Sequence, residues 1–217
     1  RETLIETVDT RGALLYGLTT SSEGRVYSAQ ADARNDVNGR ASQGMGLAEL
    51  ENRAFLNQIT QVDCEGSCDS PSFFDLEPLP PEHPAPGMAL ATPYAIEISP
   101  DDTTLVATAA GSNILFTVDA NSGAVLGRVE VGAIPRGIAL ELGENKALSR
   151  AWVLNVGDNS VSLVDVSDPA NPTFLGDIPL EAPTHPQVQL GRLAFNDANA
   201  SPTGPFSCAR CPPDGPT

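Results

Sequence analysis

Two close pairs of cysteines are the residues whose spacing most directly indicates chemistry. Cys208 and Cys211 stand in SCARC, and Cys64 and Cys68 stand in CEGSC. A C-x-x-C pair followed by histidine is the attachment pattern of c-type haem, in which both sulfurs form thioethers and the histidine binds iron. Here Pro212 occupies the place of that histidine. The other interpretation is disulfide formation, for which four cysteines allow three pairings. We expect disulfides, and no haem at this site.

The chain has only two histidines, and both stand among prolines, in PPEHPAP and PTHPQ. If haem were attached, His83 or His185 would have to supply the iron ligand that position 212 lacks. A zinc or copper site would need further ligands that the sequence does not place, so we expect surface loops. Asp32, Asp36 and Asn38 bring oxygen atoms suited to calcium into one loop, without the bidentate acid that completes an EF-hand. A turn-rich loop is the expectation, with calcium as the candidate ligand.

The charge balance of the chain excludes some classes of function. With 28 acidic and 12 basic side chains, the formal net charge is -16 at pH 7, which would repel a phosphate backbone. We therefore expect no nucleic-acid partner. No stretch approaches the ~20 apolar residues that span a bilayer, so no membrane span is expected. The sequence also offers no Ser/His/Asp or Cys/His arrangement for a hydrolase.

Cysteine usage bears on the cellular compartment. Paired cysteines are typical of oxidising environments outside the cytoplasm. The chain begins at Arg1 rather than at methionine, so a removed leader would not be visible in it. We expect a periplasmic, extracellular or cell-surface protein.

An internal repeat is the strongest signal of fold. The segments 111–131 and 157–180 share a glycine, a polar pair, an alternating apolar stretch that ends in Val-Asp, a turn and a further strand. Matching halves precede them at 92–110 and 134–156. A unit of four short strands that recurs about forty residues apart is typical of a propeller blade. The nineteen glycines, nineteen prolines and few aromatic residues also favour an all-β fold.

A looser third copy lies upstream, with two strands in 16–32 and a third in 57–63, and the segment ETLIETVDT resembles a stray last strand. The expected architecture is an incomplete β-propeller of four-stranded antiparallel blades. We expect blades at 9–66, 92–132 and 133–180, with a long loop insertion at 64–91. A proline-rich C-terminal segment follows at 181–217. About three blades fall short of the ~4 to 8 that close a propeller. We therefore expect other chains, an oligomer or the remainder of the propeller to cover the open sheets.

An aspartate recurs at the end of the third strand of each unit, as Asp63, Asp119 and Asp165. An aspartate after a strand commonly accepts hydrogen bonds from the backbone that follows and sets the turn. We expect this structural role rather than catalysis.

The repeat resembles a known family. The order P-x-x-I-x-I-S-P-D-D, L-V-A-T, N-I-x-x-x-V-D and G-x-V-x-G-x-V-x-V-G looks like the YVTN-type β-propeller repeats of bacterial extracytoplasmic and surface proteins. The resemblance covers most of 16–180. It implies a fold and leaves the ligand open, because such propellers serve many binding roles.

A second resemblance begins at GRLAFNDANASPTGPFSCARC, residues 191–211. This stretch is similar to the segment before the first haem of di-haem cytochrome c peroxidase-like proteins, some of which join it to a YVTN propeller. The departure at Pro212 falls on the iron ligand itself. We expect an extracytoplasmic interaction or assembly module without chemistry of its own. The alternative is the propeller portion of a c-type cytochrome with electron-transfer or peroxidase-like activity.

Overall fold

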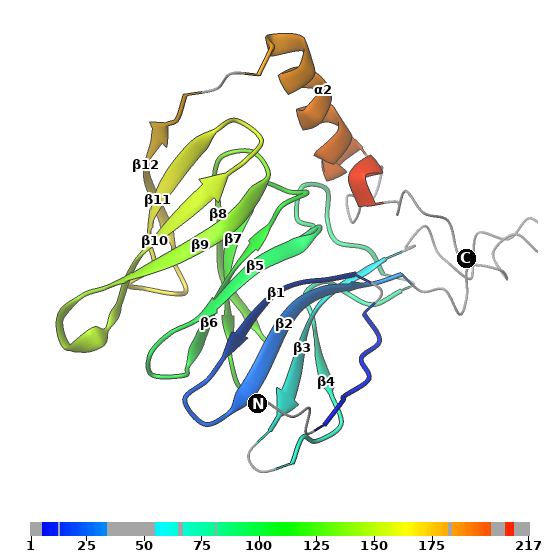
Figure 1. Ribbon diagram of the computed structural model, residues 1–217, viewed down its shortest axis with the longest axis vertical. Coiled ribbons are helices and arrows are strands. Elements are labelled where there is room, and N and C mark those ends of the chain that lie inside the picture. The colour runs from blue at the N-terminus through cyan, green and yellow to red at the C-terminus, as the bar shows by residue number, and fades with distance from the viewer. Residues whose placement is uncertain are drawn as a thin grey trace, which may run out of the picture.

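The computed structural model describes residues 6–12, 14–33, 55–64, 67–80, 82–181, 184–200 and 207–210. This part of the chain is all-β apart from one short helix and three 3-10 turns. Its strands form three four-stranded antiparallel sheets, which lie side by side in Figure 1.

Each sheet is formed by four strands that are consecutive in the chain. The first sheet consists of β1 (Leu14–Thr20), β2 (Arg25–Asp32), β3 (Leu56–Asp63) and β4 (Ser72–Asp75). The second consists of β5 (Pro93–Ile98), β6 (Thr104–Ala109), β7 (Ile114–Asp119) and β8 (Val125–Glu130). The third consists of β9 (Pro135–Leu142), β10 (Leu148–Asn155), β11 (Ser160–Asp165) and β12 (Thr173–Pro179). The remaining elements are η2 (Glu144–Lys146), α2 (Pro186–Asn196), η3 (Ala198–Ala200) and η4 (Cys208–Arg210).

The first strands of the three sheets are neighbours. β1 contacts β5, β5 contacts β9, and Figure 1 shows these strands next to one another. Because each sheet continues outward from its first strand, the arrangement is consistent with a β-propeller-like fold. Strand pairing aligns the sheets position by position, with corresponding pairs at Arg25–Asp63, Thr104–Asp119 and Arg150–Asp165.

The core consists of two apolar layers between the sheets. Leu105 and Phe116 of the second sheet belong to the cluster that also contains Tyr27 and Ile59 of the first sheet. A second cluster joins Val106 of the same strand to the third sheet. Successive residues of a strand point to opposite faces, so β6 serves both layers and every one of its residues is buried. Its sequence TLVATA is accordingly a continuous run of small and apolar residues with threonine.

Two elements differ from the expectation. Residues 72–75 form β4, which pairs with β3 and completes the first sheet, whereas the sequence analysis placed them in a loop insertion at 64–91. A four-residue strand is too short to show alternation. The helix α2 was also not expected. Its signals are a proline at the first helical position and an N-cap at His185, whose Nδ1 accepts a hydrogen bond from the N–H of Gln187. Within the described residues, no helix has the length and apolar character needed to cross a membrane.

The recurring aspartates hold turns, as expected. Asp119 Oδ1 accepts hydrogen bonds from the backbone N–H and the hydroxyl of Ser122, at 2.7 and 2.8 Å. Asp165 Oδ1 accepts from the hydroxyl and the N–H of Ser167, at 2.6 and 2.9 Å. These donors favour the charged carboxylate and lower the pKa of both aspartates. Asp63 accepts a hydrogen bond from Arg25 Nε at 3.4 Å, and the residues that follow Cys64 in its turn lie outside the described residues.

We expect a dependence of stability on acid pH that includes these turns. A carboxylate whose pKa is lower in the folded than in the unfolded state stabilises the fold above the unfolded-state pKa, and this stabilisation is lost as the pH falls through the folded-state pKa. Replacing both Asp119 and Asp165 with asparagine should therefore flatten the fall in unfolding free energy below about pH 4. Urea denaturation at a series of pH values measures this slope. Glu144→Gln on η2 is the control and should keep the wild-type slope. A wild-type slope in the double aspartate variant as well would contradict the stabilising role of the Asp119 and Asp165 carboxylates.

Candidate functional site

Three side chains at corresponding positions of the first strands form a stack. In each sheet, the residue just before this side chain pairs with the equivalent residue of the second strand. These pairs are Leu15–Gln30, Pro93–Ala109 and Pro135–Asn155, and the residues that follow are Tyr16, Tyr94 and Arg136. The ring centroids of Tyr16 and Tyr94 are 4.8 Å apart, and Arg136 Cζ lies 4.9 Å from the centroid of the Tyr94 ring. The tilted ring pair and the cation–π contact link the three sheets where their first strands begin.

A cavity of ≈ 190 Å³ lies at this stack. Its lining combines the stack with a turn of the second sheet and with the C-terminal segment: Tyr16, Thr92, Tyr94, Ala110, Gly111, Arg136, Asn196, Ser207 and Ala209. A neighbouring cavity of ≈ 330 Å³ continues along the first strands and reaches Glu97. Burial raises the pKa of Glu97, because a low-dielectric environment disfavours the charged carboxylate.

The segment that follows the third sheet lies over this stack. The N–H of Ala198 donates to the carbonyl of Gly111 at 2.9 Å, and Arg136 Nη2 donates to Asn196 Oδ1 at 3.5 Å. η4 packs against α2, so Cys208 is placed near the cavity while its own side chain is exposed. In Figure 1 α2 stands above the sheets and its C-terminal end points toward them. The segment that carries Cys208 therefore lies next to the stack. This proximity was not predictable from the sequence.

The cysteines are only partly accounted for by the described residues. Cys64 and Cys68 form a disulfide. Cys208 forms none with either of them. Cys211 lies outside the described residues, so the expected bond between it and Cys208 stays a prediction.

The other candidate ligands are not brought together by the described part of the chain. His83 is exposed, and His185 is exposed at the beginning of α2. Asp32 ends β2, while Asp36 and Asn38 lie outside the described residues. Among the side chains that the structure describes, no group of three His, Cys, Asp or Glu residues is placed to hold a metal ion.

The described residues do not fit a c-type haem. Cys208 provides one exposed sulfur, but position 212 is proline and offers no axial nitrogen.

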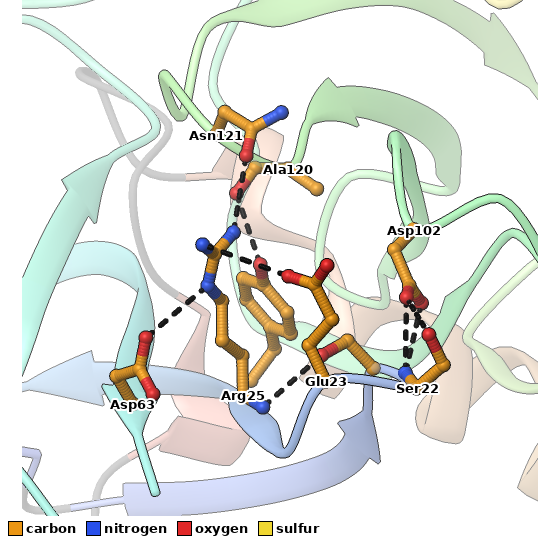
Figure 2. A network of polar contacts seen from close by, with 9 residues as sticks. Ser22, Glu23, Arg25, Asp63, Asp102, Ala120 and Asn121 are labelled. Carbon is orange, nitrogen blue, oxygen red and sulfur yellow. Dashed lines mark hydrogen bonds and ion pairs between the residues drawn. The ribbon is translucent and has the colours of Figure 1, made fainter. Parts of the chain in front are cut away.

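A polar network joins the first and second sheets at the other end of β1 (Figure 2). Asp102 accepts hydrogen bonds from the N–H of Ser22, at 3.1 and 3.0 Å, and from its hydroxyl. Arg25 donates from Nη1 to Asn121 Oδ1 at 3.1 Å. The tyrosine hydroxyl of the network, that of Tyr27, donates to the carbonyl of Ala120 at 3.1 Å inside the core. The network therefore links the first sheet to the second sheet.

The replacement Tyr27→Phe tests this clamp. It keeps the ring and removes a hydroxyl whose partner carbonyl is buried, so the free energy of unfolding should fall by about 1–2 kcal/mol. Urea denaturation measures the change. Tyr94→Phe is a matched control, because the Tyr94 ring lies in the partly exposed stack. Equal losses for the two variants would contradict the role of the Tyr27 hydroxyl.

Comparisons with known proteins support the fold alone. No family model matches the chain, and no curated protein matches it in sequence. Hydrazine synthase of Kuenenia stuttgartiensis is similar in structure, with a TM-score of 0.54 at 12% identity over 71% of this chain and 46% of that chain. A functionally unknown protein of Desulfotomaculum acetoxidans gives 0.45 at 14% identity, over 77% of this chain and 43% of that one. A chain of a mitotic checkpoint complex gives 0.46 at 11% identity, over 83% and 45%. The chain therefore spans less than half the length of these structures.

Proposed function

We propose that the three sheets are blades of a β-propeller and that the chain acts as an extracytoplasmic interaction or assembly module. The observation that supports this is the outward face of the third sheet. In the second sheet, Val106 and Leu115 lie on the corresponding face and are completely buried against the next sheet. In the third sheet, Leu154 and Ile178 on that face are 43% and 49% exposed. A face of this kind is stable in water only when something covers it.

The compartment is supported by the disulfide. Cys64 and Cys68 are bonded, and structural disulfides persist in oxidising compartments outside the cytoplasm. The acidic surface, with a net charge of -16, keeps such a protein soluble and repels nucleic acids. We place the module in the periplasm or at the cell surface.

Site-specific photo-crosslinking tests the proposal. A benzoylphenylalanine at position 154, in the exported protein, should form a covalent adduct with a protein chain. The same probe at Leu126, which is 39% exposed on the outer strand β8, should give little or none. Equal yields at both positions, or none at position 154, would overturn an interaction role for this face.

The second candidate is the propeller portion of a c-type cytochrome. It is supported by the SCARC motif, whose Cys208 is exposed and whose neighbours Ser207 and Ala209 line the cavity at Tyr94 and Arg136. We expect the intact mass of the exported protein to lack a covalent haem and to be two hydrogen atoms lighter for each disulfide. A haem adduct that disappears in Cys208→Ala would establish the cytochrome instead.

A further inference from the structure

At each junction between consecutive sheets, an asparagine side chain of one sheet accepts a hydrogen bond from the residue before the first strand of the next sheet. Asn57 Oδ1 of the first sheet accepts a hydrogen bond from the N–H of Thr92 at 3.2 Å. Asn113 Oδ1 of the second sheet accepts from the N–H of Ile134 at 2.9 Å. Thr92 and Ile134 directly precede the first strand of the following sheet, and both have positive φ, 56° and 55°. The contact is thus a repeated feature of the sheet-to-sheet junction.

Asn159 has the same place in the third sheet, where no sheet follows in the described residues. Its carbonyl accepts the N–H of Leu180 at 2.7 Å, just as that of Asn113 accepts the N–H of Val131 at 3.0 Å. Yet Asn159 Nδ2 is buried without a hydrogen-bond partner. In the sequence, Ile134 stands three residues after Val131 and Pro183 stands three residues after Leu180. Pro183 lies outside the described residues, and proline has no N–H to donate. Asn159 therefore occupies a junction position that the described residues do not complete, and its unpartnered amide group is a donor that a covering chain can satisfy with a carbonyl oxygen.

The apolar residues around Asn159 extend this incomplete junction. Leu154 pairs with Val161, which pairs with Ile178, so the three lie on one face across β10, β11 and β12. Trp152 and Leu163 form the next row of that face and are half-buried. The ion pair of Arg150 with Glu141 is at its edge, at 3.3 Å, and contributes no net charge.

The opposite end of the structure offers a complementary surface. Val26 and Val62 of the first sheet correspond to Ala151 and Val164, which pack against the second sheet. In the first sheet this face has no neighbouring sheet among the three that the structure describes. It forms an apolar groove of ≈ 230 Å³ lined by Val8, Thr10, Leu15, Leu18, Val26, Ser28, Thr60, Val62 and Cys64. Leu15 and Leu18 are 55% and 64% exposed, and Thr60 Oγ1 is buried without a partner.

We propose that two copies of this chain associate head to tail, with the third sheet of one copy packed against the first sheet of the other. The proposal rests on the proposed propeller and names its partner. Within the described residues, the chain presents both halves of a junction that it already forms twice internally, so a second copy supplies each half that these residues leave open. Six sheets would then fall within the ~4 to 8 of closed propellers, and the head-to-tail contact would close as a ring. In this contact the position of Thr92 and Ile134 is taken by Leu14, which has an N–H.

Complementation between two variants tests the geometry in sedimentation equilibrium on purified protein. Leu154→Asp and Leu18→Asp should each raise the dissociation constant by about 30-fold or more, because each places a charge in the contact. An equimolar mixture of the two should recover a dimer, since one intact third sheet meets one intact first sheet. Leu126→Asp on β8 should associate as the wild type does. Asn159→Ala should also weaken association, with a wild-type circular dichroism spectrum.

Three outcomes would overturn the proposal. The first is a wild-type chain that stays monomeric at every concentration. The second is a loss of association in Leu154→Asp but not in Leu18→Asp, which indicates contact between two third sheets. The third is a mixture that does not recover a dimer. If the chain is monomeric while a probe at position 154 crosslinks to a different protein, the proposed interaction role stands and the head-to-tail dimer fails.

Discussion

Replacing Phe116 with alanine is expected to lower the free energy of unfolding by about 3–5 kcal/mol. Phe116 is completely buried in the cluster that joins the first and second sheets, where it meets side chains such as Tyr27 and Ile59. Removing the Phe116 ring loses the free energy of burying it and leaves a cavity in the core. The β-sheets on both sides of this cavity can relax only partly to fill it. Urea denaturation followed by far-UV circular dichroism measures the loss.

The control for this prediction is Leu126→Ala, because Leu126 is 39% exposed on β8 of the same sheet. It removes an aliphatic side chain without opening a core, and a loss below about 1 kcal/mol is expected. Similar losses for the two variants would mean that the sheets do not share the core described. A lower denaturant slope for Phe116→Ala would indicate that the sheets unfold separately.

The regular sheets were predictable because their signals are local. In the second and third sheets, alternation and short polar turns define every strand between Pro93 and Pro179. The turn-setting role of Asp119 and Asp165 was likewise predictable, since the hydrogen bonds span only two or three residues. β4 was missed because its stability comes from pairing with β3, and four residues cannot express a period.

The stack at the first strands shows a different limit. Tyr16, Tyr94 and Arg136 occupy corresponding repeat positions, so an alignment of LYG, PYA and PRG contains the signal. Their contact depends on how the first strands of separate sheets approach, which no local pattern encodes. The same holds for Cys208, whose motif was visible in the sequence while its place beside the stack depends on the hydrogen bond from Ala198 to Gly111.

Replacing Asn57 with alanine is expected to lower the free energy of unfolding by about 2–3 kcal/mol. Asn57 Nδ2 donates to Glu77 Oε1 at 2.9 Å, and the N–H of Leu90 donates to the same oxygen at 2.9 Å. Both Asn57 and Glu77 are buried, so the variant leaves a desolvated carboxylate with one fewer donor and deprives Thr92 of its acceptor.

A double-mutant cycle with Glu77→Gln separates these contributions. The amide of glutamine keeps an acceptor oxygen but removes the negative charge that the Asn57 amide stabilises. If the carboxylate is the main cause, the loss on removing Asn57 should shrink by about 1 kcal/mol or more in the Glu77→Gln background. An unchanged loss would assign the effect to the hydrogen bond with Thr92, which is the contact that Asn113 repeats with Ile134. A loss below about 0.5 kcal/mol in the wild-type background would contradict any role of Asn57 in holding the two sheets together.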